Sequence, residues 1–378
     1  MKVLVACFDN WNTLAEIPYI LKKSGFEVDI LSGKDAWVKK NKFYNQWIPA
    51  KSESDDYLQQ LKELAQNSKY EWIIPGDEKL IKLLNEEITD EGLFYKLLPL
   101  TRIENREMLC SKIGFSNICT QNNILTPGYC YYPAADNNSN IDTLRFPVII
   151  KVDFSWGGLG IRVCENKPEL EKIIAGLPEH ETIIIQEFIR GKEVPVEALF
   201  WKGKLLSVTS SEILDYDKDE FSYSTRRRYF PADEKLRQAV KEFGERVGVH
   251  GFVNMAYIKA DANGSYYVIE ADLRPSSWMA YTGYAGSSFI HALRTITFPE
   301  KRVVTQTPKE VEIALFHKDL RRGFYKHDIR GLSRWVYNIK YWKYIPFYDH
   351  KLLSYTFSQL WREFFIEKMQ RTFKLRQS

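Results

Sequence analysis

The chain lacks the patterns that indicate several common kinds of protein. Its five cysteines show no CxxC spacing, which argues against a disulfide framework or a cysteine-rich metal site. Its six histidines are scattered and form no convincing Ser-His-Asp or Cys-His grouping. No apolar run approaches the length of a membrane span, and Met1 and Lys2 lead straight into a strand-like run without a signal peptide. We therefore expect a cytoplasmic protein with reduced thiols.

The charge balance and the length narrow the class further. A formal net charge of +4 is too small to indicate nucleic-acid binding, so no nucleic-acid partner is expected. At 378 residues, with 44% hydrophobic residues, the chain is too long for one simple core. We expect two or three lobes that share a sheet-rich centre, and no internal repeat is evident.

The first hundred residues read as the start of a parallel sheet. Residues 2–8 and 27–31 form apolar, strand-like runs, a helix-like stretch lies between them, and Gly25 ends it. This order is a β-α-β unit. Residues 71–74 resemble a further strand.

Polar residues follow these strands. Open parallel sheets bind ligands beyond the carboxyl ends of their strands. Asp9, Asn10, Asp77 and Glu78 therefore lie where a substrate could bind. The alternative for the acids is a helix N-cap, which is the commoner use of such residues.

A lysine followed by glycines is the first candidate site. The apolar run 146–150 predicts a buried strand that ends at Lys151, and Gly157, Gly158 and Gly160 follow it. Glycines let the backbone approach a bulky anion with its N–H groups directed at it. The alternative is a tight hairpin with an exposed lysine.

A second strand end offers groups suited to a nucleoside. Residues 182–185 predict a buried strand, which continues into Gln186, Glu187, Phe188 and Ile189, with Glu193 beyond. Backbone donors and acceptors at such an edge match the rim of adenine, and a carboxylate accepts well from ribose hydroxyls. The alternative is a strand end with solvated acids.

A predicted hairpin supplies the acidic residues. Asp261-Ala262-Asn263-Gly264 is a strong turn signal between residues 252–260 and 265–270. On the second strand Glu270 and Asp272 face the same side, about 6–7 Å apart. Such oxygen ligands suit Mg²⁺ shared with phosphates, and Arg274 suits a phosphoryl group in transfer. The alternative is a surface network of acids and an arginine.

In this order, the lysine strand, the Gly-rich loop, the Gln-Glu-Phe-Ile edge and the Glu-x-Asp-x-Arg-Pro strand resemble the ATP-grasp superfamily over about residues 1–300. The resemblance implies an α/β fold of the α+β ATP-grasp type. It predicts a Rossmann-like lobe over 1–105 and an ATP-grasp domain over 106–300. The small lobe would cover about 115–190 and the large lobe about 191–300.

The resemblance also assigns roles to individual residues. Lys112 and Lys151 would hold the phosphates of ATP, and the glycines at 157, 158 and 160 would close over them. Residues 186–189 would bind adenine and Glu193 the ribose. Glu270 and Asp272 would bind Mg²⁺ or Mn²⁺, and Arg274 would act with Lys151 on the transferred phosphate.

Three positions depart from the family pattern. The hairpin register places Ala256 or Tyr257 opposite Glu270, where an acid or glutamine is usual, with only Asn254 nearby as a polar substitute. Asp272 stands where asparagine is usual, and Ser155 replaces the first loop glycine. One metal would therefore be held by fewer protein ligands.

The resemblance implies an ATP-dependent carboxylate–amine ligase for small-molecule substrates. A carboxylate would become an acyl phosphate, and an amine would displace phosphate to give an amide-type bond, with release of ADP and phosphate. A small-molecule kinase and a degenerate nucleotide-binding protein are the alternatives. A homodimer is a further option, because dimers are common among relatives.

The run Arg226-Arg227-Arg228 is a candidate substrate contact. In an extended segment Arg226 and Arg228 share a face, and a guanidinium fork suits a carboxylate or a phosphate. The alternative is a solvated basic loop.

The family does not explain residues 301–378. They hold 17 Lys or Arg and 7 Asp or Glu, with recurrent aromatic residues at roughly helical spacing. A basic, aromatic helical extension can lie on an anionic membrane surface or dock on a partner protein. The alternative is a helical pair that packs its aromatic side onto the lobes.

Overall fold

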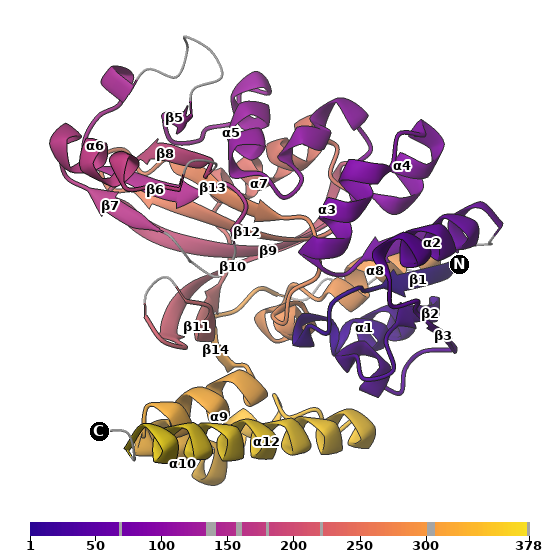
Figure 1. Ribbon diagram of the computed structural model, residues 1–378. Helices are drawn as coiled ribbons and strands as arrows, with labels where there is room; N and C mark the ends of the chain where they lie inside the picture. Colours follow the sequence, from indigo (N-terminus) through magenta and orange to yellow (C-terminus); the bar gives the residue numbers. More distant parts are fainter. Residues whose placement is uncertain are drawn as a thin grey trace.

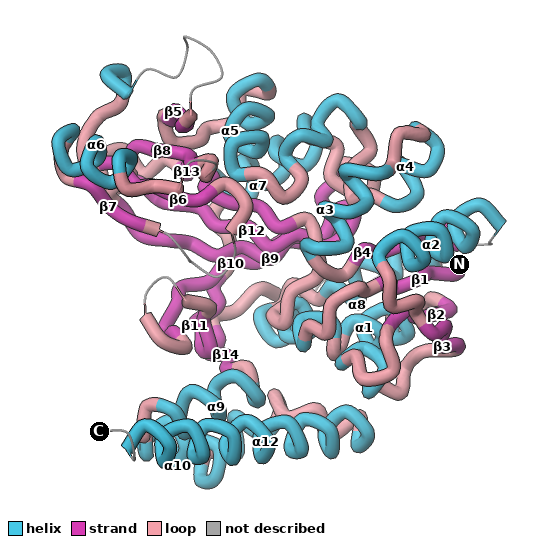
Figure 2. The backbone as a smooth tube through the Cα atoms, viewed as in Figure 1, coloured by secondary structure: helices cyan, strands magenta, loops and turns pink. Residues whose placement is uncertain are grey.

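The computed structural model describes residues 1–67, 70–133, 141–155, 161–178, 181–219, 222–300 and 307–375, with side chains up to 364. The fold is mixed α/β and contains one parallel sheet and two antiparallel sheets (Figures 1 and 2). The predicted fold class is confirmed. The predicted glycine loop at 157, 158 and 160 lies outside the described residues.

The N-terminal lobe is a four-stranded parallel sheet in the order β3-β2-β1-β4. Its central strand is buried on both faces, since Val3 and Val5 pack in one core cluster and Leu4 and Ala6 in another. The β-α-β opening is thus confirmed. The lobe contains β1 (Lys2–Ala6), β2 (Glu27–Ser32), β3 (Gln46–Pro49), β4 (Tyr70–Pro75), α1 (Ile17–Lys23), α2 (Ser54–Asn67), α3 (Glu78–Glu87) and α4 (Glu91–Leu97).

A small antiparallel sheet in the order β5-β8-β6-β7 follows. Apolar side chains of β6 and β8 pack beneath Leu170 of a covering helix. This part contains β5 (Tyr129–Tyr132), β6 (Val148–Val152), β7 (Arg162–Cys164), β8 (Ile183–Glu187), α5 (Lys112–Gln121) and α6 (Lys167–Ala175).

The largest sheet is antiparallel, with six strands in the order β13-β12-β9-β10-β11-β14. Val194, Val196, Ala198 and Phe200 alternate along β9 and share one core cluster with helix α7. This sheet contains β9 (Gly191–Trp201), β10 (Lys204–Tyr216), β11 (Ser224–Phe230), β12 (Gly251–Ala260), β13 (Tyr266–Asp272) and β14 (Val311–Ala314), with α7 (Glu234–Val247) and α8 (Phe289–Thr297) beside it.

The core does not stop at the predicted lobe boundaries. One cluster joins Leu80 and Phe94 of the N-terminal lobe to Phe200 and Val253 of the large sheet. Helix α8 packs against α1. The predicted boundaries at 105 and 300 stay predictions, but packing ties the N-terminal lobe to the large sheet.

The C-terminal segment begins as a strand of the large sheet and continues as helices. Strand β14 pairs with β11, so the extension, which is predicted to be mainly helical, also adds an edge strand to the large sheet. Trp335 and Tyr344 of this segment pack with Tyr229 of β11 and with Trp278, which follows β13, as the packing alternative expects. The helices are α9 (Phe316–Tyr325), α10 (Ile329–Tyr337), α11 (Ile339–Trp342) and α12 (His350–Leu375), and they lie together at one side of the molecule (Figure 1).

Short 3-10 helices connect these parts, at Asn12–Leu14, Trp37–Lys40, Ile103–Met108, Ile141–Thr143 and Met279–Ala285. Within the described ranges, no helix combines the length and the apolar character that crossing a membrane requires.

Candidate active site

One face of the large sheet carries a row of polar side chains. Strands alternate their side chains between two faces, and the apolar face of β9 is buried against α7. Its other face presents Glu193 and Glu197, and Glu197 lies in register with Asn254 of β12 and, beyond it, Asp272 of β13. A sheet face with such polar side chains is suited to binding polar ligands.

The hairpin register agrees with the sequence prediction. Ala256 lies opposite Glu270, and Asn254 lies opposite Asp272. Tyr257 instead faces Val268 and is buried in the core. Among the described residues, no three His, Cys, Asp or Glu side chains converge as a metal cage. Two carboxylates nevertheless fit a Mg²⁺ ion that completes its shell with phosphate oxygens and water.

Arg274 connects the hairpin to the N-terminal lobe. Its Nη2 lies 3.0 Å from Asp272 Oδ2 and 2.6 Å from Glu78 Oε1. Its guanidinium also lies over the ring of Trp11, at 4.8 Å. Glu78 is the first residue of α3 and lies 196 residues away in sequence. Arg274 is therefore held in place from two lobes.

The two acids differ in their surroundings. Glu270 is exposed and makes no ion pair or side-chain hydrogen bond with any described residue. Burial raises the pKa of the Asp272 carboxyl to about 7, against the opposing effect of Arg274, and the charges of Glu270 and Glu78 add to the rise. A cation between Glu270 and Asp272 would relieve this repulsion.

Two lysines approach the acids from the small sheet. Lys151, at 9% exposure on β6, has its pKa lowered by burial, while Glu270 opposes that shift. Lys112 begins α5, and its ammonium donates to the carbonyls of Asp153 at 3.0 Å and Ser155 at 2.8 Å. Asp153 in turn accepts from the N–H of Ile113 at 2.9 Å, which fixes α5 to the end of β6. The structure thus brings both predicted lysines near the predicted metal ligands.

The predicted adenine edge lies at the end of β8. Gln186 is buried and its amide donates to Ser116 at 3.2 Å. The N–H groups of Glu187 and Phe188 donate to carbonyls at 2.8 Å and 3.0 Å, whereas the N–H of Ile189 has no backbone acceptor in the described part of the chain. Phe188 is exposed, and Glu193 lies close enough to Lys151 for their charges to interact. This edge has a free donor beside an aromatic ring.

Asp77 has a structural role instead of the predicted substrate contact. It is fully buried at the N-cap of α3, and its Oδ1 accepts from the N–H of Leu80 at 2.9 Å. Its Oδ2 accepts from the N–H groups of Phe8 at 2.7 Å and Asp9 at 3.2 Å. Both oxygens are occupied, so the N-cap alternative is correct.

Arg226 and Arg228 share a face of β11, as an extended segment requires, but carboxylates already hold them. Arg226 lies 2.6 Å from Asp215 and 3.1 Å from Glu312. Arg228 lies 2.8 Å from Glu212 and 2.9 Å from Glu312. Neither guanidinium joins the cluster around Glu270, so their predicted substrate role gains no support from the geometry.

Sequence reasoning missed Arg227, which lies on the opposite face of β11. It is buried, its Nη1 lies 2.7 Å from Glu197, and its guanidinium lies over Trp278 at 4.5 Å. The alternation of the strand could have found it, since Arg227 points away from both neighbours.

Comparison with known proteins agrees with this geometry. A family described as an ATP-grasp domain matches residues 117–277. This part of the chain is an ATP-grasp domain. The resemblance drawn from the lysine, glycine and acidic motifs is therefore confirmed.

Relatives are similar to this chain in sequence, and solved structures are similar to it in fold. The chain is 24% identical to a D-alanine–D-alanine ligase of Pelagibacter ubique over 214 residues, which cover 52% of this chain and 70% of that one. It is 25% identical to the carbamoyl phosphate synthase large chain of Agathobacter rectalis over 162 residues, 41% of this chain but only 15% of that one. The fold resembles N5-carboxyaminoimidazole synthetase from Staphylococcus aureus, with a TM-score of 0.62 at 16% identity over 87% of this chain and 85% of that one.

Proposed function

We propose that the protein is an ATP-dependent carboxylate–amine ligase. The observation that carries this proposal is the convergence of Lys112, Lys151, Glu270, Asp272 and Arg274, whose charges interact although they come from separate elements. These side chains offer cations to a triphosphate and carboxylates to its metal ion. The match to a D-alanine–D-alanine ligase supports a ligase over other uses of ATP.

In the proposed reaction, a carboxylate oxygen of the substrate attacks the γ-phosphorus, and the bond to ADP breaks. The resulting acyl phosphate is attacked at carbon by an amine, which loses a proton as the C–N bond forms and phosphate leaves. Lys151 and Arg274 offset the negative charge that builds on the phosphoryl oxygens. Bound Mg²⁺, held by Glu270 and Asp272, would neutralise further phosphate charge.

A degenerate nucleotide-binding protein is the second candidate, favoured by Ala256 opposite Glu270. With only two carboxylates at the metal position, metal binding depends more on the nucleotide than in a site with three. Tight ATP binding without turnover would identify this case.

The test is a phosphate-release screen of carboxylates crossed with amines, with mass detection of the coupled product. A ligase yields phosphate and amide together, whereas a kinase leaves a stable phosphoester. Glu270→Ala should lower turnover on the order of a hundredfold, because it removes a metal contact. Glu87→Ala, an exposed acid at the end of α3, is the matched control and should leave turnover unchanged. Equal turnover in Glu270→Ala and the unmutated protein defeats the proposal.

A further inference from the structure

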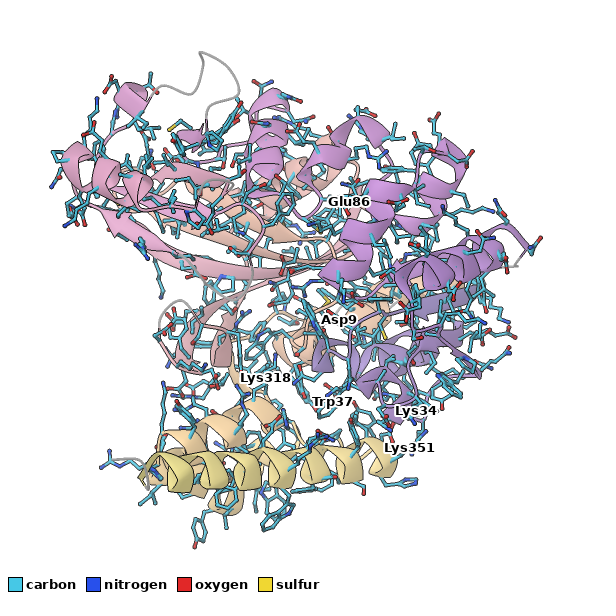
Figure 3. The ribbon with its side chains drawn as sticks, viewed as in Figure 1. Asp9, Lys34, Trp37, Glu86, Lys318 and Lys351 are labelled. Atoms are coloured by element: carbon cyan, nitrogen blue, oxygen red, sulfur yellow. The ribbon has the colours of Figure 1, made fainter. Side chains whose placement is uncertain are left out.

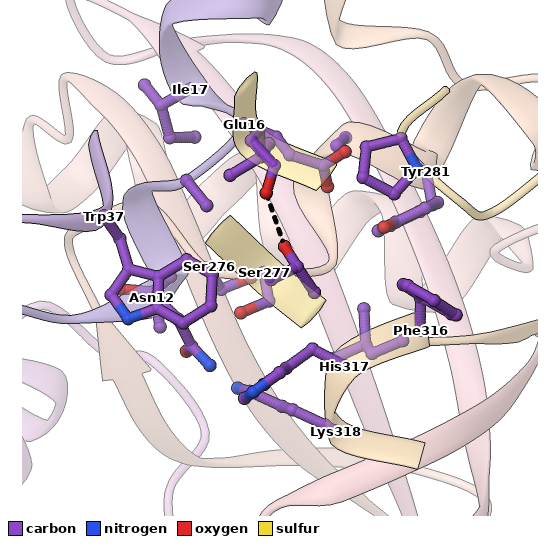
Figure 4. Close-up of a pocket in the computed structure, with 17 residues that line it drawn as sticks. Asn12, Glu16, Ile17, Trp37, Ser276, Ser277, Tyr281, Phe316, His317 and Lys318 are labelled. Carbon is purple, nitrogen blue, oxygen red and sulfur yellow. Dashed lines mark hydrogen bonds between the residues drawn. The ribbon is translucent and has the colours of Figure 1, made fainter. Parts of the chain in front are cut away.

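A cavity lies where the N-terminal lobe, the segment after Arg274 and helix α9 meet. Its volume is about 70 Å³, and its lining includes Glu16, Trp37, Ser276, His317 and Lys318 (Figure 4). Figure 3 shows Trp37 and Lys318 between the N-terminal lobe and the C-terminal helices. One water needs roughly 10–15 Å³ in such a measure, so the space suits a small molecule and excludes a nucleotide.

Several polar atoms of this cavity have no hydrogen-bond partner among the described residues. They include the hydroxyls of Thr13, Ser276 and Ser277 and both ring nitrogens of His317. Ser276 is only 8% exposed. The nearest acid to His317 is Glu363, at 3.6 Å, and burial lowers the pKa of His317 to about 4, so its ring is neutral. Because buried polar atoms are nearly always paired with protein, water or a ligand, this set can donate to and accept from a small polar ligand.

The charge around Lys318 is unbalanced. No carboxylate of the described chain lies within ion-pairing distance of its ammonium, and the ring of Tyr223 lies 4.8 Å away. Burial lowers the pKa of Lys318 to about 8, and the positive charges of Arg227 and Arg274 add to the shift. Asp217 opposes it, but Asp217 is paired with Arg321 at 2.8 Å. The cationic end of the cavity therefore lacks an anion.

An acid lies at the other side of the cavity. In Figure 4, Glu16 and Lys318 lie on opposite sides, with Ser276 and Ser277 between them. The hydroxyl of Tyr348 donates to the Glu16 carboxylate. Burial raises the pKa of Glu16, so a nearby ammonium group would stabilise its ionised form. The cavity thus has a cation at one side and a carboxyl group at the other.

The cavity also lies close in sequence to Arg274, a residue of the proposed catalytic site. Ser276 follows Arg274 by two residues, and the charge of Arg274 reaches Lys318. A carboxylate held at Lys318 would face the arginine that meets the transferred phosphate under the proposed function.

We propose that this cavity binds the carboxylate substrate and that the substrate is a small α-amino acid. Its carboxylate lies toward Lys318 and Arg274, and its ammonium group toward Glu16. The hydroxyls of Ser276 and Ser277 complete its hydrogen bonds. The C-terminal segment thus supplies, through Lys318, a specificity-determining residue. This proposal rests on the proposed ligase function.

The test measures binding by saturation-transfer NMR and calorimetry on the full chain with Mg·ADP. The probes are L- and D-alanine, propionate, which lacks the ammonium group, and ethylamine, which lacks the carboxylate. At least one alanine should bind more tightly than propionate, and ethylamine most weakly. Lys318→Met should weaken alanine and propionate about tenfold or more, whereas Glu16→Gln should weaken alanine only.

Controls separate a local effect from misfolding. Lys318→Arg should restore most of the affinity, and Lys340→Met, an exposed lysine of α11, should change nothing. Mg·ADP affinity should stay within about twofold in all variants. No alanine binding, or equal binding by Lys318→Met, overturns this proposal. Alanine binding that depends on Lys318 without phosphate release from ATP keeps the pocket and overturns the ligase instead.

A second inference concerns the outer surface of the C-terminal helices. Of the eighteen large apolar side chains that are exposed in the described chain, eleven lie between residues 324 and 364. The most exposed are Ile329 at 78% and Tyr337 at 83%, both on α10, and Ile339 at 73% on α11. Exposed apolar side chains gathered in this way mark an interaction surface.

The charge of this surface selects the partner. Residues 316–364 hold ten Lys or Arg and four Asp or Glu, of which the cation Arg322 and the acids Asp319 and Asp349 are buried. Apolar side chains among cations match a membrane surface with anionic lipids. We propose that α10 and α11 lie on such a membrane.

Vesicle co-sedimentation of the full chain tests this. The protein should sediment with phosphatidylcholine vesicles that contain about 30% phosphatidylserine and much less with phosphatidylcholine alone. Val336→Asp with Ile339→Asp should lower binding at least about tenfold, since both remove exposed apolar contacts. Leu125→Asp, an exposed leucine elsewhere, is the control. Absence of sedimentation, or self-association that the double variant abolishes, contradicts the proposal.

Discussion

The site around Asp272 and the cavity at Lys318 neutralise their charges differently. Around Asp272, two of the three described cations have protein partners: Arg274 meets Glu78 and Asp272, and Lys112 meets the carbonyls of Asp153 and Ser155. The third, Lys151, is buried and lies near Glu270 without an ion pair to any described residue. Around Lys318, no acid is paired with the ammonium, and nearby hydroxyls lack partners. The first site is thus held largely by protein contacts, whereas the cavity has a cation, unpaired in the described part of the chain, that the anion of a ligand would complete.

The difference follows from the ligand that each of the two sites would bind. A metal–nucleotide complex brings both positive and negative charge, so Arg274 and Lys112 can stay paired within the protein until it arrives. A small carboxylic acid brings a single negative charge to Lys318, which has no carboxylate partner among the described residues. The predictions below test whether this distinction holds.

The largest effect is expected from removing a cation of the site around Asp272. Lys151→Met should lower ATP turnover on the order of a hundredfold, because a buried charge that faces the phosphates is lost. Thermal stability should not fall, since burial of this charge is itself costly. Phosphate release and thermal unfolding measure the two effects, with Lys235→Met on α7 as an exposed control. Unchanged turnover would show that Lys151 has a structural role and no role in the reaction.

The next largest effect is expected in the pH dependence of amino-acid binding at the cavity beside Lys318. Lys318 is charged below about pH 8 and neutral above it, because burial lowers its pKa. Affinity for alanine should therefore fall as pH rises through 8, up to about tenfold per pH unit. A calorimetric titration from pH 6.5 to 9.5 measures it (about the range that brackets this pKa).

Lys318→Arg should be insensitive over this range. The same shift makes folding stability rise with pH between about 8 and the ordinary lysine value, because the unfolded chain binds the proton more tightly. An affinity for alanine that is flat with pH in the unmutated protein would refute the role of this ammonium.

A smaller effect should come from adding a metal ligand. Ala256→Asp places a carboxylate opposite Glu270, where the register leaves only a methyl group. We expect Mg²⁺ to bind a few-fold to about tenfold more tightly in the presence of ADP, since ligand charge sets affinity. Ala256→Asn is the uncharged control. If both variants bind Mg²⁺ as the unmutated protein does, the metal does not lie at this face.

The smallest effect is expected on β11. Arg226→Gln should leave the KM for both substrates within about twofold, because Asp215 and Glu312 occupy this guanidinium. Steady-state kinetics measure it. A KM that rises tenfold would indicate that Arg226 does contact a substrate.

Local patterns predicted much of the fold and of the site around Asp272. The Asp261–Gly264 turn and strand alternation fixed the register that sets Ala256 opposite Glu270, because both are short-range constraints. The strand-end rule also located Glu78, although not its ion pair with Arg274, which forms across 196 residues.

Long-range pairing explains what could not be predicted. Arg226 and Arg228 meet Glu312 only because β14 returns to pair with β11, and nothing near residue 226 signals this return. The inward direction of Arg227 follows from the same register. Lys318 joins the cavity because α9 packs against the lobes, which aromatic spacing in the tail did not specify.

The measurement that tests the account most directly follows an oxygen atom. The carboxylate identified by the phosphate-release screen is labelled with ¹⁸O, and the released phosphate is analysed by mass spectrometry in the presence of the amine. Transfer through an acyl phosphate leaves one carboxylate oxygen in the phosphate, so the account predicts singly labelled phosphate. Unlabelled phosphate, or a phosphoester in place of free phosphate, would contradict it.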